Sequence, residues 1–367
     1  MSYCINPWCE NRVNPSIHNF SEDQLHQCCR NCGTPLLVQG RYCLVRPLRE
    51  LDEWEASEIF EVDDLGQPKV MKLLKQEIFL PHLEREAKAL QQLDHLGIPK
   101  VEADGCFTIS IANRQIHCLV MEKIQGVNLD KWLQKHGTID QSLAINWLSQ
   151  LVELLKQIHA EDLFHRDIKL SNIMLRPNGQ LALIDFGTVR PVNTTYLAKI
   201  SGNRDITSVV SSGYTPLEQI NGKAVPQSDF YALGRTMVYL LTGKHPIDIE
   251  EDEATGRLKW RKLSVQPLSN WFVQLLDSMM DPFPGQRPLN ADAVMTRLIK
   301  QDISVRLAIR KHRTLSLLIV LNIVMIVFNL VVGIQWNKSK HEYRESLQQL
   351  SRLPSDCGKF CVSSLES

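Results

Sequence analysis

The sequence has no excess of either charge. Lysine plus arginine and aspartate plus glutamate each total 41 among its 367 residues, so the formal net charge is zero. Nucleic-acid-binding proteins usually carry a basic excess or a basic stripe, and since this chain has neither, we expect no nucleic-acid partner. Internal repeats and low-complexity tracts are also absent from the sequence. The hydrophobic content of 44% is enough for a substantial core.

The first 20 residues contain no apolar segment of the kind found in secretory signal peptides. They hold two prolines and two cysteines instead, and residues 1–40 as a whole are polar and too few to build an apolar core. We therefore expect no cleaved signal peptide, and we expect residues 1–40 to need a stabilising element other than a hydrophobic core.

Glycine is missing where a phosphate-binding fold would need it, since none occurs between Gly40 and Gly66. Residues 46–72 read RPLRELDEWEASEIFEVDDLGQPKVMK and predict two strands, a turn and a third strand with Lys72 near its end. Glycines let backbone N–H groups approach phosphate closely. The first connection carries four acids and a tryptophan: Asp52, Glu53, Trp54, Glu55 and Glu58. We expect either weaker nucleotide affinity or a lid that a partner closes, with the phosphate chemistry retained. The acids should repel phosphate unless they face solvent.

Residues 164–190, FHRDIKLSNIMLRPNGQLALIDFGTVR, hold the most informative polar side chains. Asn178 and Gly179 predict a hairpin with a two-residue type I′ turn. That register would place Asn172 opposite Asp185 at the open end of the hairpin. An amide oxygen beside a carboxylate suits Mg²⁺. Asp167, five residues before Asn172, would lie near the same place and could accept a hydroxyl proton.

HRDIKLSN (165–172) followed by DFG (185–187) resembles the catalytic loop and the metal-binding motif of protein kinases. The resemblance covers residues 41–300 and implies an α+β, two-lobed fold, ATP and Mg²⁺ as cofactors, and protein substrates. By this resemblance, Asp167 would be the catalytic base, and Asn172 and Asp185 would bind the metal within the ATP site. Lys169 would join Asp167 in catalysis and would mark a Ser/Thr-type loop.

Lys72 matches the kinase lysine that binds the α- and β-phosphates, and its partner should be a glutamate on the following helix. Apolar residues recur there at helical spacing: Leu83, Ala87, Leu90 and Leu93. Glu86 falls on the same inward side, whereas Glu84 falls on the polar face, so we expect Glu86 to pair with Lys72. Met121 would lie behind the adenine of ATP, in the run CLVMEKIQG.

Three later segments also resemble parts of the kinase pattern: GYTPLEQ (213–219), SDFYALG (228–234) and PGQRP (284–288). By resemblance, Asp229 would brace the catalytic loop and Arg287 would pair with Glu218, so all three would be structural. Six hydroxyl side chains between Asp185 and Glu218 are candidates for phosphorylation: Thr194, Thr195, Thr207, Ser208, Ser211 and Ser212.

The N-terminal cysteines occur in two short groups, Cys4 with Cys9 and Cys29 with Cys32, and Cys28 is spare. Four thiolates from two turns can close a tetrahedral zinc site and supply folding energy. Free or redox-active thiols are the alternative. A prefix opening MSYC, followed by a kinase domain, is similar to the four-Cys Ser/Thr kinases of cyanobacteria. This resemblance favours zinc and a zinc-ribbon-like module over residues 1–40.

Residues 314–336 read TLSLLIVLNIVMIVFNLVVGIQW, with about 20 residues free of charge, which is the length that crosses a bilayer. A buried core helix is rarely apolar on every face. Basic residues in 301–313 precede this segment, so we expect a single-pass protein of the cell membrane with the kinase domain in the cytoplasm. The tail, 337–367, would lie outside, where Cys357 and Cys361 could pair.

Asn322 and Asn329 lie seven residues apart within this segment, on one face of the expected helix. They could hydrogen-bond across a dimer of transmembrane helices, or they could simply be tolerated by lipid.

Together these features predict a membrane-anchored serine/threonine protein kinase that phosphorylates protein hydroxyls and itself in signalling. The missing glycines motivate one alternative, a pseudokinase scaffold that lacks efficient phosphoryl transfer. The clustered thiols motivate a second, a zinc-dependent redox or stress sensor.

Overall fold

The computed structural model describes residues 1–15, 28–52, 54–191 and 210–350, with the side chains of residues 190, 191, 301–317, 319, 320, 349 and 350 excepted. It divides into two units, Met1–Leu298 and a second unit that begins at Ile299. Several residues singled out from the sequence lie outside the described residues: Glu53, Thr194, Thr195, Thr207, Ser208, Cys357 and Cys361.

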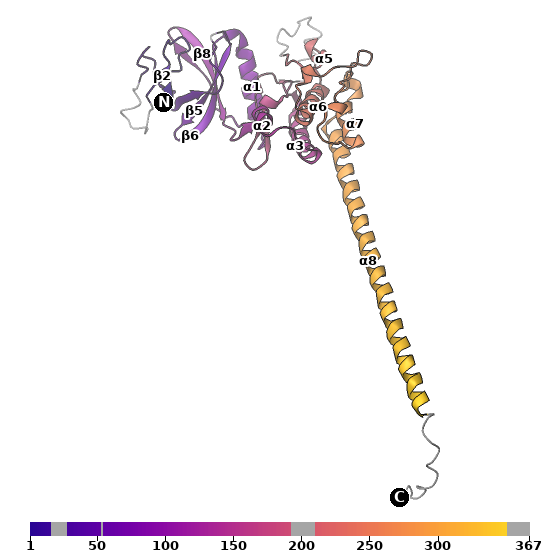
Figure 1. Cartoon of the computed structure of the whole chain (residues 1–367). Helices are drawn as coiled ribbons and strands as arrows, with labels where there is room; N and C mark the ends of the chain where they lie inside the picture. The colour runs from indigo at the N-terminus through magenta and orange to yellow at the C-terminus, as the bar shows by residue number, and fades with distance from the viewer. Residues whose placement is uncertain (16–27, 53, 192–209, 351–367) are drawn as a thin grey trace, which may run out of the picture. The chain divides into compact units, whose positions relative to one another are not determined.

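An antiparallel eight-stranded sheet dominates the first part of the Met1–Leu298 unit (Figure 1). Its order is β2-β1-β4-β5-β6-β8-β7, with β3 paired to β4. Along β5, buried residues alternate with partly exposed ones, as in a sheet with one face on the core. The strands are β1 (Ser2–Tyr3), β2 (Val13–Asn14), β3 (Leu37–Val38), β4 (Tyr42–Pro47), β5 (Ser57–Asp64), β6 (Gln67–Leu74), β7 (Cys106–Ile111) and β8 (Arg114–Glu122).

The Cys-rich segment is part of this sheet. Strand β1 pairs with β4 through Tyr3 and Leu44, and β3 pairs with the first two residues of β4, Tyr42 and Cys43. Arg12 reaches across to β5 and donates to Glu58 at 2.8 Å, with both side chains buried. The expected domain boundary at residue 40 therefore lies inside one continuous sheet.

Helix α1 (Leu80–Gln92) follows β6 after the short helix η2 (Glu77–Phe79) and buries the expected apolar stripe. The second part of the unit is mainly helical, and its longest helix, α3, begins where Asp140 accepts from the backbone N–H of Leu143. Its helices are α2 (Leu129–His136), α3 (Gln141–Ala160), α5 (Leu217–Ile220), α6 (Gln227–Thr242) and α7 (Asn270–Met279). A strand-rich first part and a helical second part confirm the expected α+β, two-lobed fold.

Short elements connect these helices. The strands are β9 (Val127–Asn128), β10 (Leu163–Phe164), β11 (Ile173–Leu175), β12 (Leu181–Leu183) and β13 (Arg190–Pro191). The 3₁₀ helices are η3 (Leu170–Asn172), η4 (Pro246–Asp248), η5 (Arg261–Leu263) and η6 (Pro284–Gln286).

The expected register of the β11–β12 hairpin is wrong by one residue. Leu175 pairs with Leu181, and the backbone N–H of Arg176 donates to Gln180, so the loop has three residues rather than two. Gly179 adopts φ +84°, as in a three-residue loop that ends in a left-handed residue. The sequence Asn178-Gly179 is compatible with a loop of two residues and with a loop of three.

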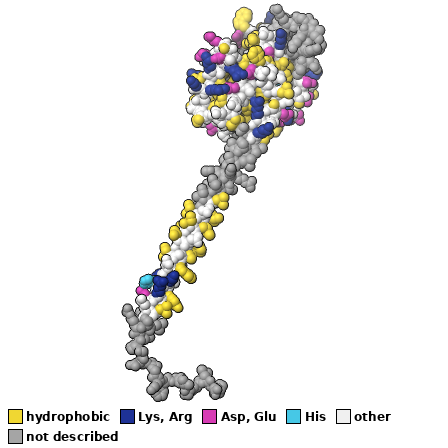
Figure 2. Space-filling view, turned by 90° about the vertical axis from the view of Figure 1, so that its right-hand side faces the viewer, with side chains coloured by type: hydrophobic (Ala, Val, Ile, Leu, Met, Phe, Trp, Pro, Cys, Tyr) yellow, Lys and Arg dark blue, Asp and Glu magenta, His cyan; other side chains and the backbone are white. Residues whose placement is uncertain are grey.

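Helix α8 runs from Ala291 to Leu350, and its early residues Ala291, Val294 and Leu298 are buried in the first unit. From Leu318 to Trp336, the large apolar side chains that the structure describes are all 45–70% exposed. Figure 2 shows these apolar side chains along the helix, followed by basic ones. Leu321–Gln348 is, among the described residues, the one helical stretch long and apolar enough to cross a membrane.

Candidate active site

Lys72, Glu86 and Asp185 come together in an ion cluster. Lys72 lies on β6 and Glu86 on α1, and the Lys72 Nζ atom is 2.7 Å from Glu86 Oε2. The same Nζ atom is 3.3 Å from Oδ1 of Asp185. Glu86 is 1% exposed, whereas Glu84 is exposed, as the helical spacing predicts.

The charges of this cluster support one another. Lys72 holds the pKa of the Asp185 carboxyl well below its usual range, with Arg49 as a second cation beside it. Burial opposes the charge on Lys72, but Glu86 and Asp185 outweigh burial and raise the pKa of Lys72. Burial raises the pKa of Glu86, against the attraction of Lys72. Asp185 is therefore ionised at neutral pH, as a Mg²⁺ ligand must be.

Asp167 is the centre of a second polar group and is 5% exposed. Its Oδ2 atom lies 2.8 Å from Lys169 Nζ and accepts from Asn172 Nδ2 at 2.9 Å. Behind it, the Asp229 carboxylate accepts from the backbone N–H groups of His165 and Arg166 at 2.9 and 2.8 Å. These contacts fix the position of the carboxylate while leaving it a proton acceptor.

The residues around Asn172 and Asp185 fit a magnesium ion. The Asn172 amide donates to both the carbonyl and the carboxylate of Asp167, so its oxygen is the atom that remains for a metal. Asp185 has φ +66°, and this left-handed backbone, rather than the hairpin register, sets its side-chain direction. A Cβ at Gly187 would lie 2.9 Å from Lys72 Nζ, so a larger residue there would displace the Lys72 side chain within the ion cluster.

Ser211 is a site residue whose position the sequence did not reveal. Its hydroxyl donates to Oδ1 of Asp167 at 2.6 Å, and Lys169 Nζ donates to the same hydroxyl at 3.0 Å. The sequence identified Ser211 only as one of several candidates for phosphorylation. Its neighbour Ser212 is exposed. No periodicity distinguishes the two serines, because both lie in an irregular segment.

The structure also describes the positions of Arg287, Glu218 and Met121. Arg287 Nη1 lies 2.6 Å from Glu218 Oε1, and this pair links the segment after Ser211 to η6. Met121 is buried on β8, paired with Val70 of β6.

The connection between β4 and β5, residues 48–56, differs from the ion cluster because its charged side chains are exposed. Glu50, Asp52, Glu55 and Trp54 all face solvent, and Trp54 is 89% exposed. Glu58 is not in this connection at all but is buried on β5, paired with Arg12 and Lys75. The acids that the structure describes here are thus either solvated or already paired.

Arg49 in this connection was not identified from the sequence. Its Nη2 atom lies 3.3 Å from Oδ2 of Asp185, on the oxygen that Lys72 does not contact. No motif marks such a residue, since the contact joins positions 136 residues apart.

The four expected cysteines form one cluster. The Sγ atoms of Cys4, Cys9, Cys29 and Cys32 all lie within 4.8 Å of one another. Cys4 and Cys32 are 3.5 Å apart, and Cys9 and Cys29 are 3.7 Å apart. A tetrahedral zinc site with Zn–S bonds of about 2.3 Å has sulfur atoms about 3.8 Å apart. The donor set therefore fits zinc, and Cys28 is exposed and outside the cluster.

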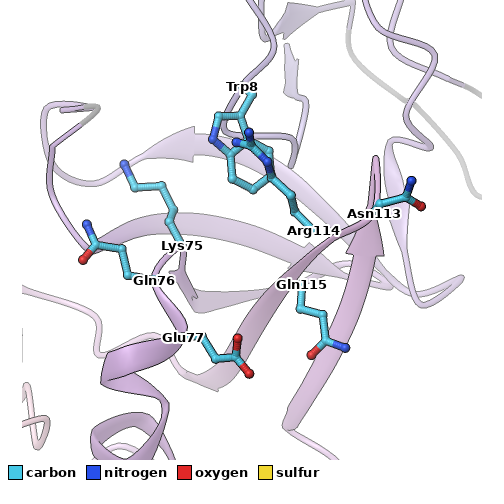
Figure 3. A pocket seen from close by; sticks show the side chains of 7 residues that line it. All are labelled: Trp8, Lys75, Gln76, Glu77, Asn113, Arg114 and Gln115. Carbon is cyan, nitrogen blue, oxygen red and sulfur yellow. The ribbon is translucent and has the colours of Figure 1, made fainter.

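A surface cavity of about 630 Å³ opens between the Cys-rich segment and the sheet (Figure 3). It is lined by Trp8, by residues 75–77 after β6 and by residues 113–115 at the β7–β8 turn. The Arg114 guanidinium lies over the Trp8 ring at 4.5 Å from its centroid. The lining includes none of the residues expected to act on ATP, so this cavity is separate from the candidate active site.

Comparison with known proteins gives a match to the family model described as "Protein kinase domain" over residues 63–314. Serine/threonine-protein kinase B of Synechocystis sp. is 30% identical, covering 81% of this chain and 52% of that protein. Serine/threonine-protein kinase F of the same organism is 32% identical, covering 80% and 63%. Serine/threonine-protein kinase PrkC of Bacillus subtilis is 26% identical, covering 67% and 38%. The alignments thus span between about two fifths and two thirds of these relatives.

Proposed function

Because the chain belongs to the protein kinase family, we propose that it transfers the γ-phosphoryl group of ATP to serine and threonine hydroxyls of protein substrates. The observation that supports this most is the joint presence of two groups. One is the ion cluster of Lys72, Glu86 and Asp185, and the other is Asp167 with its hydrogen-bond partners. Phosphoryl transfer needs positioning and charge neutralisation more than covalent chemistry, and these groups supply both.

In the proposed reaction, Asp167 accepts the proton of the substrate hydroxyl. Lys169 and Asn172 hold the carboxylate, and Lys169 adds a positive charge where negative charge develops. Lys72, oriented by Glu86, binds the α- and β-phosphates. Asn172 and Asp185 would hold Mg²⁺, which neutralises phosphate charge when bound.

Met121, buried on β8, would lie behind the adenine. Glu218, Asp229 and Arg287 act structurally through the contacts described above. Autophosphorylation would use hydroxyls of the segment between Asp185 and Glu218.

Radiolabelled transfer from ATP by the full-length chain in detergent tests this proposal. The substitution Asp167→Asn should lower transfer by about 10²- to 10⁴-fold, because the amide cannot accept the proton. Asp162→Asn is the matched control, since Asp162 is exposed in a turn at φ +56° and asparagine tolerates that backbone. Equal transfer by Asp167→Asn and wild type would rule out the proposed chemistry.

The pseudokinase alternative rests on the glycine-free connection over residues 48–56. It predicts that Mg²⁺–ATP binds to the wild type, or that a partner binds to it, without phosphoryl transfer. A wild type that binds nucleotide by calorimetry but gives no more transfer than Asp167→Asn would favour it.

The cysteine cluster is proposed as a structural zinc site over residues 1–40, ahead of a kinase domain at 41–300. Cys29→Ser should reduce bound zinc from about one ion per chain to near zero and lower the melting temperature by several degrees, because zinc binding supplies folding energy. Cys28→Ser, one residue away and exposed, should retain both. Metal content by mass spectrometry and thermal unfolding measure these effects. The redox-sensor alternative would be favoured if the wild type contained no zinc and its kinase activity changed with the concentration of oxidant.

The exposed apolar side chains of α8 support a single membrane span, proposed over residues 314–336. Burying them in lipid removes an apolar surface that soluble proteins avoid. The proposed topology places the kinase domain and residues 301–313 in the cytoplasm and residues 337–367 outside. A dimer through Asn322 and Asn329 has less support, because Asn322 Nδ2 donates to Leu318 O within its own helix.

A further inference from the structure

Arg49 places a guanidinium at the aspartate expected to bind magnesium. Its Nη2 atom is 3.3 Å from Oδ2 of Asp185, while Lys72 Nζ is 3.3 Å from Oδ1. Both oxygens of Asp185 therefore contact a cation, one from the sheet and one from the connection between β4 and β5. The Asp185 side chain is only 23% exposed, so few other cations can reach it.

The Arg49–Asp185 contact is easily exchanged. The Arg49 side chain is 51% exposed, and exposed ion pairs contribute little to stability. Its importance is therefore its position rather than its strength. A guanidinium at Asp185 lies next to the place where Lys72, Asn172 and Asp185 would receive phosphate and metal. The Arg49 guanidinium can leave the Asp185 carboxylate and pair with another anion without any change in the fold.

The backbone on both sides of Arg49 is held in place. The N–H of Leu48 donates to the carbonyl of Ile59 at 2.8 Å. Further along, Lys75 Nζ donates to the carbonyl of Asp52 at 2.7 Å. A long, flexible side chain on an anchored backbone can thus swing between two nearby anions without moving the connection.

Arg49 is also the one basic residue of residues 48–56 in the sequence. The neighbouring acids Glu50 and Glu55 are exposed, and Asp52 accepts from the backbone N–H of Trp54 at 2.8 Å. In kinases, the glycine-rich connection at this place covers the phosphates with backbone N–H groups. A glycine-free connection can instead supply N–H donors from an arginine, whose planar fork matches phosphate oxygens.

We propose that Arg49 binds the triphosphate of the nucleotide and replaces the glycine-rich loop in this role. Without nucleotide, Arg49 pairs with Asp185; with Mg²⁺–nucleotide, it leaves Asp185 to the metal and binds phosphate oxygens. This inference rests on the proposed function, because it assumes a nucleotide in the same site. It also means that Arg49 raises the affinity for Mg²⁺–nucleotide but opposes Mg²⁺ binding to the empty site.

The test measures binding of Mg²⁺ with a non-hydrolysable ATP analogue to the full-length chain by calorimetry. Arg49→Gln should raise the Kd by about 10-fold or more, because it removes charge-assisted hydrogen bonds, and Arg49→Lys should fall between it and wild type. Arg46→Gln is the matched control and should stay within about twofold, since Arg46 is exposed and paired with Glu61.

Two further readouts separate phosphate binding from other effects. Arg49→Gln should raise the KM for ATP with little change in kcat. Without nucleotide it should bind Mn²⁺ more tightly than wild type, measured by electron paramagnetic resonance. An analogue Kd for Arg49→Gln equal to or lower than that of wild type would overturn the role of Arg49 and leave the proposed function standing. A wild type that binds no Mg²⁺–nucleotide would overturn both.

Discussion

The two sides of the proposed nucleotide site, called here its floor and its roof, are built in different ways. The floor consists of side chains that are mostly buried and that form two groups, Lys72 with Glu86 and Asp185, and Asp167 with Asn172; within each group the contacts are 2.7–3.3 Å long. The roof, residues 48–56, exposes the charged side chains that the structure describes there and contacts the floor through Arg49.

This difference in burial separates phosphoryl-transfer chemistry from nucleotide affinity. Buried charges that pair with each other cannot be replaced singly, because the partner would be left unpaired in a low-dielectric site. Exposed charges can change with little effect on stability. The floor is therefore where chemistry should be sensitive to substitution, and the roof is where nucleotide affinity can vary while chemistry is kept.

The larger effect on the rate of phosphoryl transfer is expected from substitution of Ser211, whose hydroxyl contacts Asp167 in the floor. Ser211→Ala removes the hydroxyl that donates to Asp167 Oδ1 and accepts from Lys169, so phosphoryl transfer should fall about 10-fold. Ser211→Thr keeps the hydroxyl and should retain most of the rate. Steady-state kinetics with saturating ATP measure both variants.

Ser212→Ala is the matched control for this comparison, because Ser212 is adjacent and exposed. It should leave kcat within about twofold of wild type. If Ser211→Ala and Ser212→Ala have the same kcat, the contact with Asp167 contributes nothing to catalysis and the floor is less interdependent than its geometry indicates.

The sequence was most informative about the floor, and the reason is physical. Helical spacing identified Glu86 as buried and Glu84 as exposed, because each helix position fixes the direction of its side chain. Cysteine spacing likewise identified the four thiols that lie together, because each pair comes from one short turn. The family resemblance is confirmed by a match over residues 63–314.

The sequence was least informative where contacts depend on irregular backbone. The hairpin register was wrong because Asn178-Gly179 fits loops of two or three residues. The side chain of Asp185 is directed by a positive φ that no periodicity predicts. Arg49 and Ser211 reach the site from irregular segments, so only the three-dimensional structure relates them to Asp185 and Asp167.

The smallest effect is expected from the roof acids. Glu55→Gln should change the affinity for Mg²⁺–nucleotide by less than about twofold at physiological salt, because an exposed carboxylate is screened beyond about 8 Å. Calorimetry at about 20 mM salt, where screening is weak, and at about 150 mM salt, which is physiological, measures this effect on affinity. A tenfold gain in affinity at both salt concentrations would mean that Glu55 faces the phosphates, and Arg49 would then not be the one charged residue of the roof that affects nucleotide binding.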